Sequence, residues 1–274
     1  MSEFSVFLPL VFGLLAAGVV GGLIAGLLGV GGGIVLVPAM SIAFSFLGYS
    51  SDVIQHIAVG TSLAIIIATG TTSALAHNRR GAVMHDVVKL WAPFIMIASL
   101  LGGLMAGLFS GNALRIIFGV VALFIAINIV LPIQKKLMSR LSSSVLTNRI
   151  SAFFIGYISA LMGIGGGSLS VPTLSAFSHS IHKSVGTGAA LGVLIAIPGA
   201  IGFMISGLGV AGRVDYSIGY VNIPALIFIG IIASAVAPIG AALAHKLNQK
   251  MLKSAFAIFL LIVALRMLFV AFTG

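Results

Sequence analysis

The feature that most constrains this chain is a series of apolar stretches that are long enough to cross a lipid bilayer. A spanning helix needs about 20 predominantly apolar residues. Six stretches meet this requirement, namely 54–76, 90–109, 113–133, 184–207, 219–244 and 251–272. Only 7% of the residues are charged, against about 25% in a soluble domain, so this surface is not built to face water. The sequence therefore predicts an all-α polytopic membrane protein.

Two further apolar regions, 5–47 and 150–178, are interrupted near their middle by glycine runs. These runs read Gly26-Leu-Leu-Gly-Val-Gly-Gly-Gly33 and Gly163-Ile-Gly-Gly-Gly167. Each glycine costs about 1 kcal/mol relative to alanine inside a helix, so three in a row predict a break. We therefore expect each region to form a re-entrant-like helical hairpin with the glycines at its turn.

The two interrupted regions are also related to each other in sequence. GLLGVGGGIVLVPAM (26–40) and ALMGIGGGSLSVPTL (160–174) are identical at seven of fifteen positions. Further along the chain, Val-Gly-Thr occurs at 59–61 and again at 185–187. The same order of features in both halves predicts an internal duplication. The predicted parts are a first repeat 1–133, a linker 134–149 and a second repeat 150–274.

Positive charge predicts the orientation in the membrane, because Lys and Arg gather on the cytoplasmic side. Clusters occur at 79–89, 135–149 and 246–253. If all three are cytoplasmic, region 150–178 must enter and leave the membrane on the same side. Each repeat is then one hairpin followed by three spanning helices, an odd number of net crossings, so the two repeats have inverted topology. The linker 134–149 is then cytoplasmic, and both termini are periplasmic if the membrane is the inner (plasma) membrane.

The paired glycine breaks are the first candidate binding site. A helix that begins inside the membrane presents backbone N–H groups and a positive dipole end, which favour an anion. Hydroxyl side chains follow the second break, whereas Ile34, Val35 and Val37 replace most of them after the first. The alternative is that the glycines only let helices pack closely. The candidate residues are Gly31, Gly32, Gly33 and Ser41 in the first half, and Gly165, Gly166, Gly167, Ser168 and Thr173 in the second.

The Val-Gly-Thr elements are the second candidate. In this reading Thr61, Ser62 and Thr187 donate hydroxyl hydrogen bonds to an oxyanion from the helices that follow the hairpins, beside Gly60 and Gly186. An equally good alternative is that the hydroxyls satisfy backbone carbonyls or pack against small residues.

A titratable residue lies close to the first of these elements. His56 is the nearest such group to Val-Gly-Thr at 59–61, and it is the candidate proton carrier if transport is coupled to protons.

Charged groups are informative mainly by their absence from the apolar stretches. The four acids are Glu3, Asp52, Asp86 and Asp215, and all of them lie outside these stretches. A carboxylate proton relay or a carboxylate-bound sodium ion is therefore disfavoured, and an anionic substrate is favoured over a cation. The net charge of +10 comes mainly from the Lys and Arg clusters that set the orientation in the membrane. We therefore expect no nucleic-acid partner.

The sequence contains no residue pattern that is typical of a catalytic or cofactor-binding site. The chain has no cysteine, which excludes thiolate metal sites and iron–sulfur clusters. Ser168 follows three glycines, but the G-x-S-x-G pattern of a nucleophile is not matched. We expect neither an enzyme nor a bound cofactor or metal.

The sequence resembles the sulfite exporter TauE/SafE family of permeases. The resemblance rests on GLLGVGGGIVLVPAM (26–40), on HIAVGTS (56–62) and on ALMGIGGGSLSVP (160–172), and it covers essentially the whole chain. It implies a permease that exports sulfite or an organosulfonate. Two repeats with broken helices favour alternating access as the mechanism of a secondary transporter, and a homodimer is a candidate assembly. The alternatives are an anion channel, a transporter of another sulfur compound, or a membrane assembly protein without transport activity.

Overall fold

The structure is a computed structural model that describes residues 15–24, 32–131, 144–244 and 249–273. Its elements are a helix over Leu15–Ile24, α2 (Gly33–Phe46), α3 (Ser51–Arg79), α4 (His85–Met105), η1 (Ala106–Leu108), α5 (Gly111–Val130), α7 (Val145–Met162), α8 (Gly167–Ala176), α9 (Ile181–Ser206), β1 (Ser217–Ile218), β2 (Val221–Asn222), α10 (Ile223–Ala244) and α11 (Gln249–Thr273). Six of the described helices are long and apolar enough to cross a membrane, namely α3, α4 with η1, α5, α7, α9 and α11. Five of them match predicted spans; the sixth, α7, was predicted as part of a hairpin, and α10 counts among the shorter apolar helices over its described residues. The prediction of an all-α polytopic membrane protein is confirmed.

The second interrupted region is two helices of unequal length. α7 has 18 residues and α8 has 10, so α8 reaches roughly 15 Å, about half of a bilayer core. α7 begins at Val145, inside the segment that the sequence assigned to the linker. Ser144 caps its start by accepting a hydrogen bond from the N–H of Thr147, and Arg149 lies over the ring of Phe94. The basic residues of this segment indicated a linker, but its last five residues belong to α7.

The start of α10 also differs from the expected boundary at residue 219. The strands β1 and β2 pair in antiparallel fashion, with Ser217 opposite Asn222. This small hairpin uses the residues up to Asn222, so the helix begins only at Ile223.

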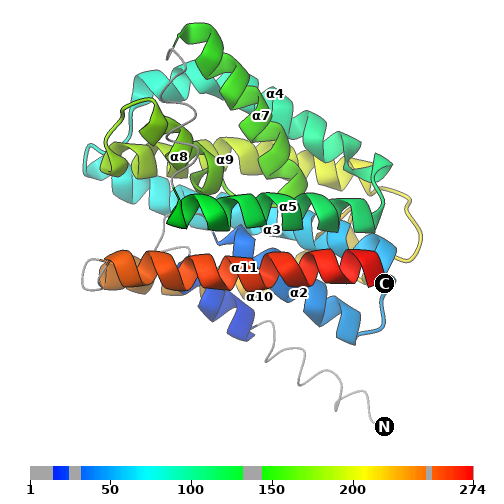
Figure 1. Cartoon of the computed structure of the whole chain (residues 1–274). Coiled ribbons are helices and arrows are strands. Elements are labelled where there is room, and N and C mark those ends of the chain that lie inside the picture. The colour runs from blue at the N-terminus through cyan, green and yellow to red at the C-terminus, as the bar shows by residue number, and fades with distance from the viewer. Residues whose placement is uncertain (1–14, 25–31, 132–143, 245–248, 274) are drawn as a thin grey trace.

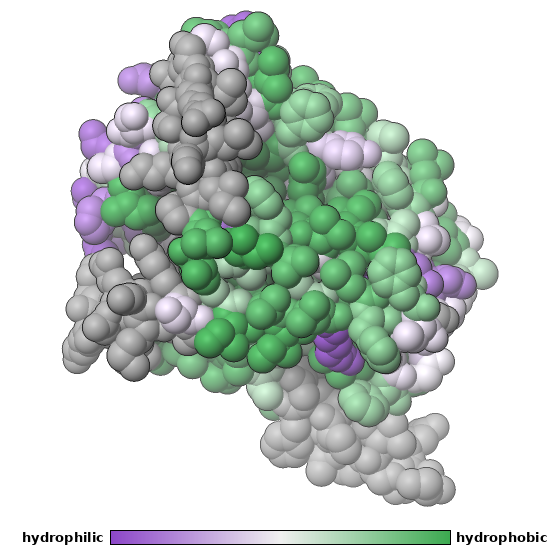
Figure 2. Space-filling view, viewed as in Figure 1, coloured by the Kyte–Doolittle hydropathy of each residue, from purple (hydrophilic) through white to green (hydrophobic). Residues whose placement is uncertain are grey.

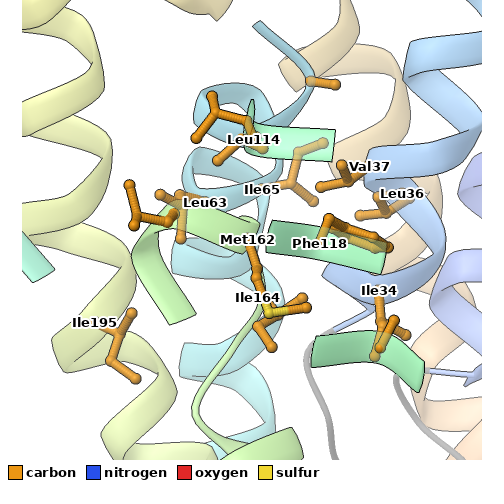
Figure 3. Close-up of a cluster of buried hydrophobic side chains, with 14 of the residues drawn as sticks. Ile34, Leu36, Val37, Leu63, Ile65, Leu114, Phe118, Met162, Ile164 and Ile195 are labelled. Atoms are coloured by element: carbon orange, nitrogen blue, oxygen red, sulfur yellow. The ribbon is translucent and has the colours of Figure 1, made fainter. Parts of the chain in front are cut away.

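α3 is the central helix of the molecule. In its most apolar 18-residue window 89% is buried, against 33% for α4 with η1. It contacts α2, α5, α9 and α10. Figure 3 shows Leu63 and Ile65 of α3 among buried side chains of α2 and α5, including Val37 and Phe118. The outer helices instead expose apolar side chains, and Figure 2 shows a broad hydrophobic face with hydrophilic residues toward its edges.

Contacts between helices follow the order of the two halves. α3 packs against α9, and α5 packs against α11 (Figure 1), so each of these helices meets its counterpart in the other half. Within each half the short helix lies on the next long one, α2 on α3 and α8 on α9. This arrangement fits two related halves, whereas their inverted orientation in the membrane stays a prediction.

Loops that the charge pattern assigned to the same side of the membrane lie at the same end of the structure. At one end Tyr49 donates to Asp215 at 3.2 Å and Arg115 donates to the carbonyl of Ser51 at 3.0 Å. At the other end Trp91 donates to Asn148 at 2.9 Å. The 29 residues of α3 separate the two ends by roughly 40 Å. The first is called the outer end below and the second the inner end, after the predicted orientation.

Sidedness can be tested with single cysteines, because the chain has no cysteine of its own. Tyr216 and Leu146 are exposed residues at the outer and the inner end, respectively. We expect a membrane-impermeant maleimide to label Tyr216→Cys in intact cells, and Leu146→Cys only after the membrane is opened. The reverse labelling pattern would contradict the predicted orientation.

Candidate functional site

The two glycine breaks meet beside α3. Gly33 begins α2 and Gly163 follows the last residue of α7. A Cβ atom on Gly33 would collide with the carbonyl oxygen of Gly163. Ser62 of α3 donates a hydrogen bond to that same oxygen, with an O–O distance of 2.7 Å. The structure thus brings Ser62 together with residues of both breaks, at a buried point of the molecule.

Glycine is required at both breaks by the backbone itself. Gly32 has φ = 75° before α2, and Gly163 has φ = 68° after α7. These are left-handed conformations, which residues with a Cβ adopt only at a cost. Gly31, a predicted site residue, lies outside the described residues.

The second break also packs tightly against α9. A Cβ on Gly166 would lie 2.7 Å from the backbone nitrogen of Gly192. One on Gly192 would approach the Cα of Gly165 to 3.7 Å, and one on Gly188 would lie 3.3 Å from the Cα of Gly167. Close helix packing, the alternative left open by the sequence, therefore accounts for these glycines. A larger residue here disturbs packing whether or not a ligand binds.

The helix starts after the two breaks differ in their side chains. α2 opens with buried Ile34 and Val35, beside the Gly163 carbonyl. α8 opens with Ser168 and Ser170, which are 6% and 0% exposed and whose hydroxyls have no hydrogen-bond partner.

The other predicted hydroxyls near the breaks have partners within the protein. Thr173 donates to the carbonyl of Leu169 at 2.8 Å. Ser41 donates to Gln55 at 3.3 Å. Neither is as free to bind a ligand as the two serines that open α8.

Unpartnered hydroxyls gather in the second half. Among the described residues, the buried side-chain atoms without a hydrogen-bond partner are Nε2 of Gln55 and the hydroxyls of Ser159, Ser168, Ser170, Ser175 and Ser184. All five hydroxyls belong to α7, α8 and α9. A buried polar group without a partner costs about 1–3 kcal/mol, so such hydroxyls are expected where a ligand supplies the acceptors.

The start of α8 also offers backbone donors, in the same turn as the hydroxyls of Ser168 and Ser170. Its first described helical bond runs from the N–H of Ser170 to the carbonyl of Gly166, at 2.8 Å. The N–H groups of the preceding residues have no acceptor within the helix, and they carry the positive end of the helix dipole. Gly167 and Ser168 therefore place neutral hydrogen-bond donors, without a cation, around the start of α8.

The Val-Gly-Thr elements form two equivalent contacts between the halves. Thr61 accepts a hydrogen bond from the N–H of Asn222 at 2.9 Å, just before α10. Thr187 accepts one from the N–H of Met84, also at 2.9 Å, just before α4. Both hydroxyls therefore satisfy backbone groups, as the alternative reading held, but the groups are N–H donors rather than carbonyls.

The glycines of these elements make the same contacts possible. A Cβ on Gly60 would lie 2.5 Å from the carbonyl oxygen of Tyr220, and one on Gly186 would lie 2.5 Å from that of Ala82. In each case the loop of the opposite half rests on the glycine, and the threonine beside it binds the N–H two residues further on. This repetition identifies Val-Gly-Thr as a docking element between the halves.

His56 lies apart from the start of α8. It is 3% exposed and its ring contacts the carbonyls of Ala106 and Phe109 and the ring of Tyr220, all at the outer end.

Tyr49 also lies at the outer end. Its pKa is raised mainly by burial, and the side-chain hydrogen bond and negative charge of Asp215 raise it further. The Tyr49 phenol therefore stays protonated and continues to donate to Asp215.

Three residues of the unpartnered cluster were not predicted from sequence, namely Gln55, Ser159 and Ser184. Each is a polar residue within an otherwise apolar run, which is the signal that could have found them. A hydroxyl in a helix normally donates to the carbonyl four residues earlier, as Thr69 does to Ile65. Sequence alone does not show which hydroxyls lack this partner.

A hollow of about 280 Å³ opens at the inner end, between α3, the start of α4 and α9. Thr71, Asn78 and His85 contribute its polar lining, and Ala190 and Val193 of α9 line the opposite wall. Val193 follows Gly192, whose backbone contacts Gly166 at the second break. On an α-helix Ala190 and Val193 lie on the face opposite Gly192, so α9 stands between this hollow and the start of α8.

Comparison with known proteins settles the family. The model of the family described as "Sulfite exporter TauE/SafE" matches residues 14–267. The chain belongs to the sulfite exporter TauE/SafE family. It is 34% identical to a probable membrane transporter protein of Haemophilus influenzae, over 92% of this chain and 96% of that one. No solved structure matches the chain.

Two less similar proteins also match over nearly the whole length. The chain is 25% identical to the probable membrane transporter protein YunE of Bacillus subtilis, over 93% of this chain and 96% of that one. A probable membrane transporter protein of Methanocaldococcus jannaschii is 24% identical, over 92% and 91% of the two chains. The family and these relatives indicate a multi-pass membrane transporter and not an enzyme.

The docking role of Val-Gly-Thr can be tested by stability. Because its Cβ would lie 2.5 Å from a backbone oxygen, Gly60→Ala should lower the free energy of unfolding by about 1–3 kcal/mol. Gly230→Ala is the matched control, since the nearest atom to its Cβ is 4.0 Å away and alanine favours the helix. Thermal unfolding in detergent measures both. Equal melting temperatures for the two variants would contradict the docking role.

Proposed function

We propose that this transporter exports a small oxyanion, sulfite or an organosulfonate, which binds at the start of α8. The observation that carries the proposal is that Ser168 and Ser170, in the first turn of α8, have buried hydroxyls without a partner, on the same turn as the free N–H groups of that helix. Ser168 and Ser170 supply hydroxyl donors, and the first N–H groups of α8 supply backbone donors. The oxygen atoms of a sulfite or sulfonate group accept from donors of both kinds.

Neutral donors suit transport better than a buried cation would. A guanidinium or ammonium group would hold an anion by a charge-assisted hydrogen bond, roughly twice as strong as a neutral one. Hydroxyl and amide donors compensate the lost hydration and still let the anion leave. Carboxylates, which would repel an oxyanion, occur in the sequence only outside the apolar stretches.

The two ends of the molecule support an alternating-access mechanism. A hollow opens at the inner end between α3, the start of α4 and α9. The outer end is tied by contacts of His56 and Tyr49 with neighbouring loops. A second hollow, at the outer end, is lined only by the loop residues 210–217, so it does not pass between helices. In this reading the structure is the inward-facing state.

Export requires no coupling ion on energetic grounds. Moving one negative charge out of a negative-inside cell is favourable by about 2.3 kcal/mol per 100 mV. A uniporter that alternates between inward-facing and outward-facing states is therefore sufficient. The membrane in question is the inner (plasma) membrane, and both termini would face the periplasm if the charge pattern sets the orientation.

Removing the hydroxyls of α8 tests the site without adding bulk. We expect Ser168→Ala together with Ser170→Ala to lower sulfite flux into proteoliposomes about tenfold or more, the loss of one to two hydrogen bonds in the bound state. Because both hydroxyls are unpartnered, stability should be unchanged or slightly higher.

The control is Ser99→Ala on α4. Ser99 is fully buried like Ser170, but its hydroxyl donates to the carbonyl of Met96 at 3.2 Å. This variant should lose about 0.5–1.5 kcal/mol of stability and keep its flux. Normal sulfite, sulfoacetate, thiosulfate and taurine flux in the α8 double variant would remove the proposed site.

A carrier and an anion channel differ in their kinetics. An alternating-access carrier should show sulfite flux that saturates with concentration, and labelled sulfite should accumulate by counterflow when unlabelled sulfite is preloaded. Flux that rises without saturation and shows no counterflow would identify a channel instead.

A further inference from the structure

His56 lies where three parts of the outer end meet. Its Nδ1 is 2.9 Å from the carbonyl oxygen of Asp52, on its own helix. Its Nε2 is 3.1 Å from the carbonyl oxygen of Ala106 and 3.0 Å from that of Phe109, at the end of α4 and η1. The ring stacks on Tyr220 of the other half, with the ring centres 4.7 Å apart. One buried imidazole therefore joins α3, the α4–α5 connection and the loop before α10.

Both ring nitrogens of His56 face hydrogen-bond acceptors. A neutral imidazole has one N–H donor and one nitrogen with a lone pair. In either tautomer one nitrogen would point its lone pair at a carbonyl oxygen, which repels it. Only the imidazolium ion donates from both nitrogens, so the three carbonyls are arranged for the protonated ring.

The stacked partner adds to the preference for a cation. A positive charge over the face of a tyrosine ring is attracted by the ring's quadrupole. Burial raises the pKa of Tyr220, with Arg213 acting against it, so the phenol stays neutral while His56 titrates. The Tyr220 carbonyl also rests on Gly60, and the N–H of Asn222 binds Thr61.

The charged groups around His56 oppose each other. Burial and the nearby Arg115 of α5 disfavour a positive charge on the ring, whereas the three carbonyls favour it. The negative charge of Asp52 acts on Arg115. Arg115 is itself held by the side chain of Asn112 and the carbonyl of Ser51. From the remaining packed elements, η1 and the loop before α10, the groups that face the ring are backbone carbonyls and Tyr220.

We propose that His56 is a proton-binding site whose protonation holds the outer end closed. With the proton bound, the ring donates to α3 and to the α4–α5 connection and stacks on Tyr220. When the proton leaves, one nitrogen repels the carbonyl opposite it, and the contact between the halves loosens at this end. The effect on transport rests on the function proposed above, whereas protonation and closure do not depend on a substrate.

The experiment measures closure directly, without substrate. Spin labels on Leu108→Cys and Ile218→Cys, both exposed, stand on the two sides of the His56–Tyr220 contact. In nanodiscs the label–label distance should be short and narrow at the acid end of a pH series and longer or broader at about pH 8, above the range in which histidine titrates. In His56→Gln it should not change with pH. His77→Gln, on the same helix near the inner end, is the control and should keep the change.

A second variant guards against misfolding of His56→Gln. Tyr220→Leu removes the stacking but keeps the three carbonyls, so the transition should move to lower pH. A wild-type distance that does not change with pH overturns the proposal, and so does an unaltered change in His56→Gln. Sulfite flux measured alongside separates the two proposals. If the Ser168→Ala, Ser170→Ala variant transports sulfite normally while the distance still changes with pH, only the anion site is rejected.

Discussion

The fold depends on how a hydrophobic molecule satisfies backbone groups where its helices stop inside the membrane. Lipid offers no hydrogen bonds, so a helix end there needs a partner within the protein. The hydrogen bond from Ser62 to the carbonyl of Gly163 provides it where the first and second breaks meet. It connects the central helix α3 with the end of α7 and the start of α2, and it leaves the start of α8 with donors still free.

The two halves are alike in their backbone contacts but differ in the side chains at their breaks. Their Val-Gly-Thr elements make matching contacts, Thr61 with Asn222 and Thr187 with Met84. Their breaks do not match, because the start of α2 is lined with Ile34 and Val35 whereas α8 carries unpartnered serines. The two halves thus make matching contacts but differ at their breaks, as expected if the proposed substrate site lies in the second half alone.

Sequence reasoning identified most of the fold because its signals are local. Apolar length predicted the spanning helices, and glycine runs predicted the breaks. It misjudged the start of α7, where Arg149 suggested a linker but packs over Phe94. The site was harder, because the role of a hydroxyl depends on its partner. Thr61 and Ser168 look alike in sequence, yet one accepts from the backbone of the other half and the other has no partner.

The central claim is that an oxyanion binds at the start of α8. The most direct measurement is a crystal structure with selenite, whose selenium locates a sulfite-like anion by its anomalous signal. The account predicts a peak whose oxygen atoms lie within hydrogen-bond reach, about 3 Å, of the Ser168 hydroxyl and the first N–H groups of α8. A fully occupied peak elsewhere, with none at α8, would contradict it.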